Sequence, residues 1–130
     1  MALKFHPKPG TILVCDYSGF RVPEMVKRRP CVVVSPRLRR RHDLCTVVPL
    51  SATPPKPPEP YHHLITLDRP LPYPFDTAAM WAKCDMLATV SFARLDLIKV
   101  ARRRYIQPTL PAGDMDQIRI CIMHALGIIS

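Results

Sequence analysis

The apolar residues in the first two thirds of the chain fall in short runs, which proline, glycine and charged residues separate. Such runs are typical of β-strands, because β-branched and apolar side chains pack well on a pleated sheet while proline and glycine favour turns. The pattern predicts strands over residues 11–17, 31–34, 45–50, 61–67 and 78–88.

The C-terminal part of the chain changes to a helical period. An apolar stripe recurs there at helical spacing, formed by Ile118, Cys121, Ile122, Ala125 and Leu126. Asp114 and Gln117 fit a capping box at the start of this helix, and Gly127 is an end signal. Ile120 and Met123 lie off the stripe, which suggests a second apolar side and an oligomer interface.

Two other segments complete the predicted architecture. Residues 54–60 are mostly proline and predict an extended, polyproline-like surface loop. Residues 91–98 fit a short helix capped by Ser91, with a strand as the alternative. Many short strands, proline-rich turns and one terminal helix together predict a mainly β (α+β) fold, a compact barrel in one domain over residues 1–130.

Composition limits the classes of protein to which the chain can belong. Hydrophobic residues make up 48% of its 130 residues, enough to bury a core without disulfides or a structural metal. No apolar run is long enough to span a membrane and the N-terminus lacks a secretion signal, so we expect a cytoplasmic protein with no membrane partner. The cysteines show no clustering, which predicts buried, reduced thiols: Cys15, Cys31, Cys45, Cys84 and Cys121.

Charge gives the first indication of a partner. Nineteen Lys and Arg against ten Asp and Glu leave a formal net charge of +9. The excess is mostly arginine and is concentrated at residues 27–29, 37–41 and 102–104. Arginine forms forked hydrogen bonds with phosphate, so this clustering favours a polyanionic partner over a surface charge that only serves solubility.

Several common kinds of active site are excluded by their missing motifs. The chain has no G-x-x-x-x-G-K phosphate loop, no G-x-G-x-x-G and no H-E-x-x-H. Its histidines lack the spacing of metal ligands, and the adjacent pair His62 and His63 should point to opposite faces of a strand. We therefore predict no metal site and no cofactor.

One pattern remains in the first half of the chain. Residues 9–14 are followed by a charged loop that contains Glu24, then by Arg29-Pro30-Cys31-Val32-Val33-Val34-Ser35-Pro36, and last by Thr46-Val47-Val48-Pro49-Leu50-Ser51. In this order and spacing the three elements resemble the MazF/PemK family of toxin–antitoxin ribonucleases. The resemblance covers residues 9–53 and weakens beyond them, where residues 81–85 and the terminal helix still match later elements of the family.

The resemblance implies a functional site. The family's arginine before the proline of the second strand falls on Arg29, and the hydroxyl residue that ends the third strand, usually threonine, falls on Ser51. Glu24 matches an acidic position in the first loop. Basic residues near these positions are predicted to contact RNA: Lys27, Arg28, Arg37, Arg39 and Arg40.

These residue types suit RNA cleavage without a metal. A ribose 2′-OH can attack the neighbouring phosphorus, leaving a 2′,3′-cyclic phosphate and a 5′-OH. The transition state gathers negative charge, which the guanidinium of Arg29 and the hydroxyl of Ser51 can stabilise, while Glu24 is the candidate base. The implied function is therefore that of a sequence-specific, metal-independent endoribonuclease acting on single-stranded RNA, the toxin of a type II toxin–antitoxin system.

The resemblance also implies an SH3-like barrel of about five to seven strands with short helices, a homodimer, and a cognate antitoxin with an acidic, disordered tail. Two alternatives stay open. A nucleic-acid-binding barrel without catalysis would fit Ser51 in place of threonine. A gyrase-binding poison of the CcdB type uses the end of its C-terminal helix, but this chain ends in the apolar residues 127–130, unlike the aromatic end of that family.

Overall fold

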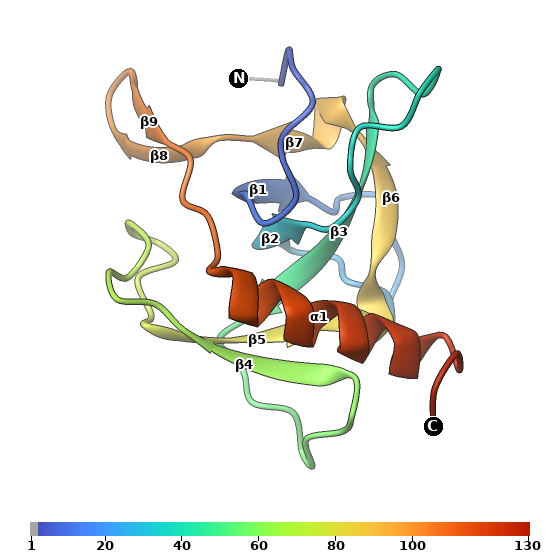
Figure 1. Ribbon diagram of the computed structural model, residues 1–130. Coiled ribbons are helices and arrows are strands. Elements are labelled where there is room, and N and C mark those ends of the chain that lie inside the picture. The colour runs from blue at the N-terminus through green and yellow to red at the C-terminus, as the bar shows by residue number, and fades with distance from the viewer. Residues whose placement is uncertain (1–2) are drawn as a thin grey trace.

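The computed structural model describes residues 3–130, and over this range the chain forms nine strands, two short 3-10 turns and one α-helix (Figure 1). The strands are β1 (Ile12–Asp16), β2 (Arg28–Val33), β3 (Leu44–Ser51), β4 (His62–Thr66), β5 (Ala79–Lys83), β6 (Ala88–Ser91), β7 (Leu95–Asp96), β8 (Ile98–Ala101) and β9 (Arg104–Ile106). The 3-10 turns are η1 (Cys84–Met86) and η2 (Phe92–Arg94), and the helix is α1 (Ala112–Ala125). The prediction of a mainly β fold with a C-terminal helix is confirmed.

Seven of the strands described form one antiparallel sheet. Its order is β4-β5-β3-β2-β1-β7, with β6 attached to β3, while β8 and β9 form a separate hairpin. β5 pairs with the C-terminal end of β3 and β6 with its N-terminal half, so η1 is the corner between them. β3 is thus the strand on which three others meet. In Figure 1, β4, β5 and α1 lie together, and the β8–β9 hairpin projects away from them.

Both faces of the central strands are buried, which explains their nearly continuous apolar sequence. One face packs into a helix-side cluster that includes Ile12, Val32, Leu50 and Ile118. The other face packs into a loop-side cluster with the following members: Leu3, Leu13, Cys15, Tyr17, Cys31, Val33, Cys45, Val47, Val90, Phe92 and Leu95. Alternate residues of a strand therefore enter different clusters, and the polar residues of β1, β2 and β3 lie toward the strand ends.

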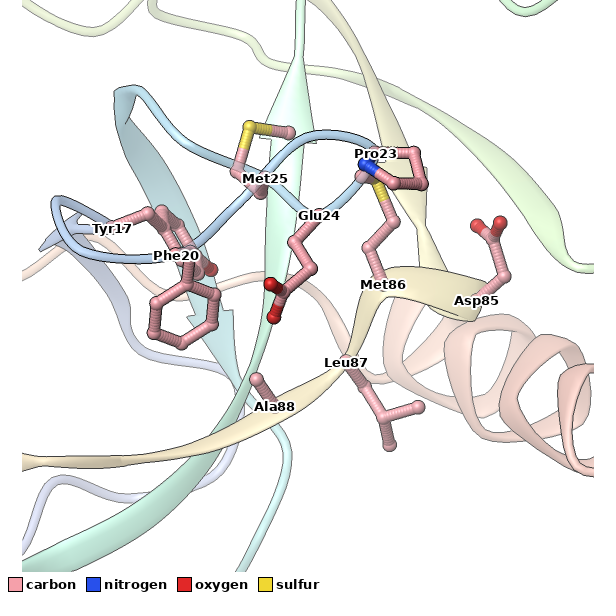
Figure 2. A pocket seen from close by; sticks show the side chains of 9 residues that line it. All are labelled: Tyr17, Phe20, Pro23, Glu24, Met25, Asp85, Met86, Leu87 and Ala88. Carbon is pink, nitrogen blue, oxygen red and sulfur yellow. The ribbon is translucent and has the colours of Figure 1, made fainter.

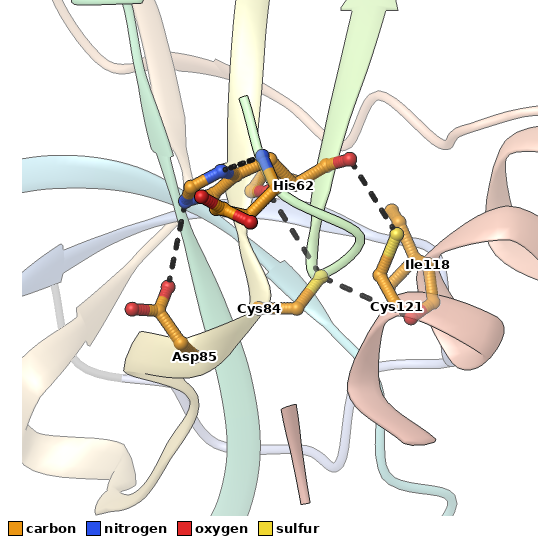
Figure 3. Close-up of polar contacts among 7 residues, drawn as sticks. His62, Cys84, Asp85, Ile118 and Cys121 are labelled. Carbon is orange, nitrogen blue, oxygen red and sulfur yellow. Dashed lines mark hydrogen bonds and ion pairs between the residues drawn. The ribbon is translucent and has the colours of Figure 1, made fainter. Parts of the chain in front are cut away.

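Helix α1 is fixed to the sheet by apolar burial and by sulfur contacts. Met115, Ile118 and Cys121 form its buried side. The Cys121 thiol donates to the carbonyl of His62 at 3.6 Å, and the Cys84 thiol lies 3.8 Å from the carbonyl of Ile118 (Figure 3). Burial raises the pKa of the Cys84 and Cys121 thiols. All five cysteines are buried and free, as the sequence predicts.

The start of α1 differs from the prediction. The helix begins at Ala112, directly after Pro111, and Asp114 is not its cap. The Asp114 carboxylate instead accepts a hydrogen bond from Nε2 of His63 on β4, at 2.8 Å. The carboxylate that the capping-box pattern assigned to the helix end therefore bonds a residue of another element instead.

The end of α1 agrees with the prediction. Gly127 follows the helix with φ +72°, a left-handed conformation that favours glycine. The amide of Ile128 donates to the carbonyl of Met123 at 2.8 Å, and that of Gly127 to His124 at 3.1 Å. Along the predicted stripe Ile118 and Cys121 are buried, while Leu126 is 58% exposed.

Two predicted elements divide differently from the sequence pattern. The predicted strand 78–88 is broken at η1, where the chain turns from one end of β3 toward the other. Residues 91–98 form η2 followed by strands rather than a helix, so the strand alternative is the correct one beyond the first turn. Ser91 still caps that turn, because its hydroxyl accepts the Ala93 amide at 3.1 Å. Among the residues described, no helix is long and apolar enough to cross a membrane.

Replacing Ile118 by alanine should lower the free energy of unfolding by about 2–5 kcal/mol, because a fully buried isoleucine would leave a cavity beneath α1. Ile120→Ala is the matched control: it makes the same change in the same helix at a side chain that is 37% exposed. Urea denaturation followed by circular dichroism measures both variants. Equal losses in the two variants would contradict the docking of α1 through Ile118.

Candidate functional site

The antiparallel register of β2 and β3 places two predicted site residues opposite each other. Cys31 pairs with Pro49 and Val33 with Val47. Two residues beyond the Cys31–Pro49 pair, the same register sets Arg29 opposite Ser51, and the two side chains point to the same face of the sheet. Trp81 of β5 pairs with Ser51 from the other side. We call Arg29, Ser51 and Trp81 the cross-strand row.

Two prolines end the β2–β3 ladder immediately before this row. The last pair is Cys31 and Pro49, although β2 begins at Arg28 and β3 continues to Ser51. Proline has no N–H to donate to a ladder, and Pro30 and Pro49 stand at this point in the two strands. The strand ends that carry Arg29 and Ser51 are therefore not joined by this ladder.

Arg29 is half-buried and has an unpaired donor. Its Nε atom is buried and has no hydrogen-bond partner among residues 3–130. Buried donors in proteins nearly always have a partner, because an unpaired one costs free energy. A guanidinium in this state can bind an anionic oxygen strongly. Its neighbour Arg28 points to the opposite face, where Nη2 lies 3.9 Å from a carboxylate oxygen of Asp96.

Ser51 offers a hydroxyl that can donate. The residue is 2% exposed, and its Oγ accepts the amide of Thr53 at 3.1 Å. This bond uses a lone pair of the hydroxyl and leaves its hydrogen available for a second acceptor. Because Ser51 is nearly covered, a phosphate can reach the hydroxyl only when neighbouring side chains move.

Glu24 lies in the β1–β2 loop, where it closes a turn. Its Oε1 accepts the amide of Arg21 at 2.9 Å, and its own amide donates to the carbonyl of Arg21 at 2.7 Å. The second carboxylate oxygen stays available. A cavity of about 420 Å³ adjoins the loop (Figure 2), and its lining comes from the loop and from η1 and β6: Tyr17, Phe20, Pro23, Glu24, Met25, Asp85, Met86, Leu87 and Ala88.

The walls of this cavity are aromatic and apolar, with carboxylates at Glu24 and Asp85. The guanidinium of Arg94 holds the loop in place, because it lies 4.8 Å from the centre of the Phe20 ring and donates to the carbonyl of Ser18 at 2.6 Å. Carboxylates accept hydrogen bonds from base amino groups. The half-exposed ring of Phe20 can contact a base, whereas Tyr17 is fully buried. The cavity has the chemistry to hold a nucleobase.

The cavity and the cross-strand row share one face of β3. Ala88, which lines the cavity, pairs with Val47. Val47, Pro49 and Ser51 alternate along β3 and so point to the same side. The separation between Val47 and Ser51 is about 13 Å, for four residues at roughly 3.3 Å each. A short single strand can therefore contact both places.

The predicted RNA-binding residues divide into two groups. Lys27 and Arg28 are exposed at the start of β2, where Arg28 faces the side of the sheet opposite to the row. Arg37, Arg39 and Arg40 are exposed on the loop between β2 and β3, at the opposite end of β3. The length of β3 separates the two groups by about 25 Å.

Comparison with known proteins decides the family. The model of the family described as "PemK-like, MazF-like toxin of type II toxin-antitoxin system" matches residues 8–126. The chain belongs to this toxin family. The Escherichia coli (strain K12) protein YifN, described as uncharacterized, is 30% identical over 150 aligned residues that cover 100% of this chain and 98% of YifN.

Solved structures of PemK/MazF toxins have the same fold. An endoribonuclease from a mycobacterial species, solved in complex with its cognate antitoxin, aligns with a TM-score of 0.67 at 21% identity over 96% of this chain and 99% of that one. MazF from Deinococcus radiodurans aligns with a TM-score of 0.65 at 19% identity, covering 95% and 99% of the two chains.

Some residues beside the row and the cavity were not predicted from the sequence. Asp85 lines the cavity and lies 3.8 Å from Nε2 of His62, whose Nδ1 accepts the amide of Glu59 at 3.0 Å (Figure 3). Trp81 belongs to the row because β5 pairs with β3, a pairing that the sequence does not reveal. No sequence signal marked Asp85, because the pattern predicts an unbroken strand over residues 78–88 and the turn η1 appears only in the structure. Within residues 3–130, no three His, Cys, Asp or Glu side chains are grouped so as to hold a metal ion.

The Glu24 turn makes a testable prediction. Glu24→Ala removes the acceptor for the Arg21 amide, whereas Glu24→Gln keeps a carbonyl oxygen there. Amide hydrogen exchange at Arg21 should be roughly fivefold faster in the alanine variant, which corresponds to a bond worth about 1 kcal/mol. The glutamine variant should exchange like the parent chain. Identical exchange in all three proteins would show that the turn does not depend on this side chain.

Proposed function

We propose that the chain is the toxin of a type II toxin–antitoxin system and cuts single-stranded RNA as a sequence-specific, metal-independent endoribonuclease. The observation that carries this proposal is the cross-strand row, in which a half-buried arginine with an unpaired Nε lies opposite a hydroxyl that can donate. Membership of the PemK/MazF family supports the proposal, as does a structural relative that is named as an endoribonuclease.

The proposed reaction needs only groups of the RNA and the protein. The 2′-oxygen attacks the adjacent phosphorus while its proton passes to a base, and the bond from phosphorus to the 5′-oxygen breaks. The leaving oxygen takes up a proton, so the products are a 2′,3′-cyclic phosphate and a 5′-OH. Negative charge grows on the non-bridging phosphoryl oxygens, where preorganised donors act most strongly.

Arg29 and Ser51 would supply these donors. Partial burial strengthens the interaction of the guanidinium with a phosphoryl oxygen. The Ser51 hydroxyl would donate a second hydrogen bond from the neighbouring strand. Glu24 would accept the 2′-OH proton through the carboxylate oxygen that does not hold the Arg21 amide, once the β1–β2 loop closes toward the row.

The other predicted residues would hold the strand. Lys27 would contact a phosphate beside the row, and Arg28 would contact RNA only on the opposite face of the sheet. Arg37, Arg39 and Arg40 would contact phosphates farther along. The cavity beside Glu24 would hold a base and thereby give sequence preference, because its carboxylates distinguish amino groups from carbonyl groups.

The proposed partners follow from charge and from the relatives. A net charge of +9 suits the acidic, disordered tail of a cognate antitoxin, which would compete with RNA for the same basic surface. The solved relatives include a MazE–MazF complex from Deinococcus radiodurans, at a TM-score of 0.58 and 20% identity. We place the proposed toxin in the cytoplasm, as a homodimer.

Purified protein should cut long single-stranded RNA at discrete positions in excess chelator, and the fragments should carry cyclic phosphate ends. Arg29→Ala should lower kcat about a hundredfold to a thousandfold, because one transition-state donor is lost. Arg29→Lys keeps the positive charge but loses the forked pair of donors, so its kcat should lie between those of the parent chain and of Arg29→Ala. Gel analysis with end-group mapping measures all three proteins, and Arg119→Ala, an exposed site on α1, is the control.

RNA binding without any cutting by the parent chain would favour a non-catalytic binding barrel. Absence of both would favour a poison of a protein target, as in CcdB-type toxins.

The Ser51 hydroxyl can be tested by a pair of variants. Ser51→Ala should lower kcat about a hundredfold, because the donor disappears. Ser51→Thr restores the residue typical of the family and should cut at least as fast as the parent chain, since the added methyl restricts the rotamer of the hydroxyl. Single-turnover cleavage in excess enzyme separates this step from RNA binding. An alanine variant that cuts like the parent chain would remove Ser51 from the mechanism.

A further inference from the structure

A second hollow lies at the other end of β3, away from the cross-strand row. It is a cleft of about 410 Å³ between the N-terminal segment, the β2–β3 loop and η2. Its walls include Lys4, Phe5, His6, Arg37, Arg41 and Phe92. We propose that this cleft is a second RNA-binding subsite, which holds a phosphodiester between its cations and a base against Phe5. This inference rests on the proposed function, because RNA is taken as the substrate.

The charge of the cleft is positive and only slightly offset. Lys4, Arg37 and Arg41 line it, and none of these three cations forms an ion pair with another residue in the described range 3–130. Its remaining ionisable lining consists of two histidines, His6 and His42, and one carboxylate, Asp43. Three cations beside one carboxylate leave a net attraction for phosphate.

The cleft is also well defined in shape. Phe92 lines the cleft and is 7% exposed, and the centres of the His6 and Phe92 rings lie 5.7 Å apart in an edge-to-face arrangement. The Phe92 amide donates to the carbonyl of Asp43 at 2.9 Å, which joins floor and wall. Nδ1 of His6 donates to the carbonyl of Pro7 at 2.8 Å, so Nε2 is left for a ligand. Leu3, buried in the loop-side cluster, anchors the N-terminal wall.

The combination of cations and an exposed ring favours a nucleic acid strand. Phe5 is 44% exposed beside the cations, and a solvent-exposed phenylalanine can stack on any base. Arg37 and Arg41 can form forked contacts with phosphate oxygens. An acidic peptide would use the cations but not the ring. The distance of about 25 Å along β3 means that only an RNA of several nucleotides can occupy the row and the cleft together.

Binding of uncleavable 2′-O-methyl RNA tests the subsite. We would compare a strand of about twenty nucleotides with a tetranucleotide, whose phosphates cannot span the distance, by fluorescence anisotropy over a range of salt. The double variant Arg37→Ala/Arg41→Ala should weaken binding of the long strand about tenfold or more. The slope of log K against log salt should decrease by about 1.4, since each phosphate contact of a single strand contributes about 0.7. The advantage of the long RNA over the tetranucleotide should shrink.

Two further variants separate the parts of the cleft. Phe5→Ala should weaken binding of the long strand about tenfold, because a stacking platform is lost, yet leave the salt slope unchanged. The matched control is Arg69→Ala/Arg119→Ala, which removes two exposed arginines from the β4–β5 loop and from α1. It should change long-strand affinity much less than the cleft variant does. On cleavable long RNA, the cleft variant should raise KM and leave kcat unchanged, because the row is intact.

Several results would overturn the inference. If the control pair weakens long-strand binding as much as the cleft variant does, the RNA is attracted by the overall positive charge of the surface and not by the cleft. If the cleft variant leaves the ratio of long-strand to tetranucleotide affinity unchanged, there is no separate subsite. Displacement by adenosine monophosphate or inorganic phosphate with no effect of strand length would indicate a site for small phosphates. Loss of poly-glutamate binding in the cleft variant, with RNA binding intact, would indicate a peptide site. If the parent chain binds long RNA through the cleft but cuts none, the proposed catalysis fails and the subsite stands.

Discussion

The register between β2 and β3 is the constraint on which the rest of the site depends. Because the side chains of a strand alternate between faces, a slip by one residue would move Arg29 to the side where Arg28 now faces Asp96. The same slip would exchange the helix-side and loop-side clusters for every residue of β2. Burial of apolar residues on both faces therefore fixes the register, and the position of the arginine follows from core packing.

This double burial also explains why the polar chemistry lies at strand ends. The middle of β3 is covered on both faces, so neither face there can admit a ligand. At one end, the row and the cavity beside Glu24 lie on the same face. At the other end, the β2–β3 loop carries its arginines beside the N-terminal segment. Under the proposed function, an RNA strand would therefore contact the protein at the two ends of β3 and not along its buried middle.

The sequence predicts the buried elements better than the exposed ones. The first four predicted strands and the terminal helix follow from apolar periodicity, and Gly127 marks the helix end because a left-handed residue is needed there. The β8–β9 hairpin, which contains Arg102 and Arg103 in its turn, has mostly exposed residues and so lacks a hydrophobic pattern. Asp114 matched a cap locally, but its partner His63 is distant in sequence. The cavity beside Glu24 and the cleft near Arg37 arise from three-dimensional neighbours that no local spacing encodes.

Pro30 and Pro49 connect the register to the proposed chemistry. A strand pair that continued its ladder past Cys31 would join the backbones of Arg29 and Ser51 and draw the strand ends together. The two prolines stop the ladder at this point, because they have no N–H to donate. The paired residues of β2 and β3 still determine which face of the sheet Arg29 and Ser51 point to. The outcome is a pair of strand ends that are aligned by the core but not closed by their own hydrogen bonds. Under the proposed function, a phosphate between them would give the Nε of Arg29 the partner that it lacks among residues 3–130, once the side chains that cover Ser51 move.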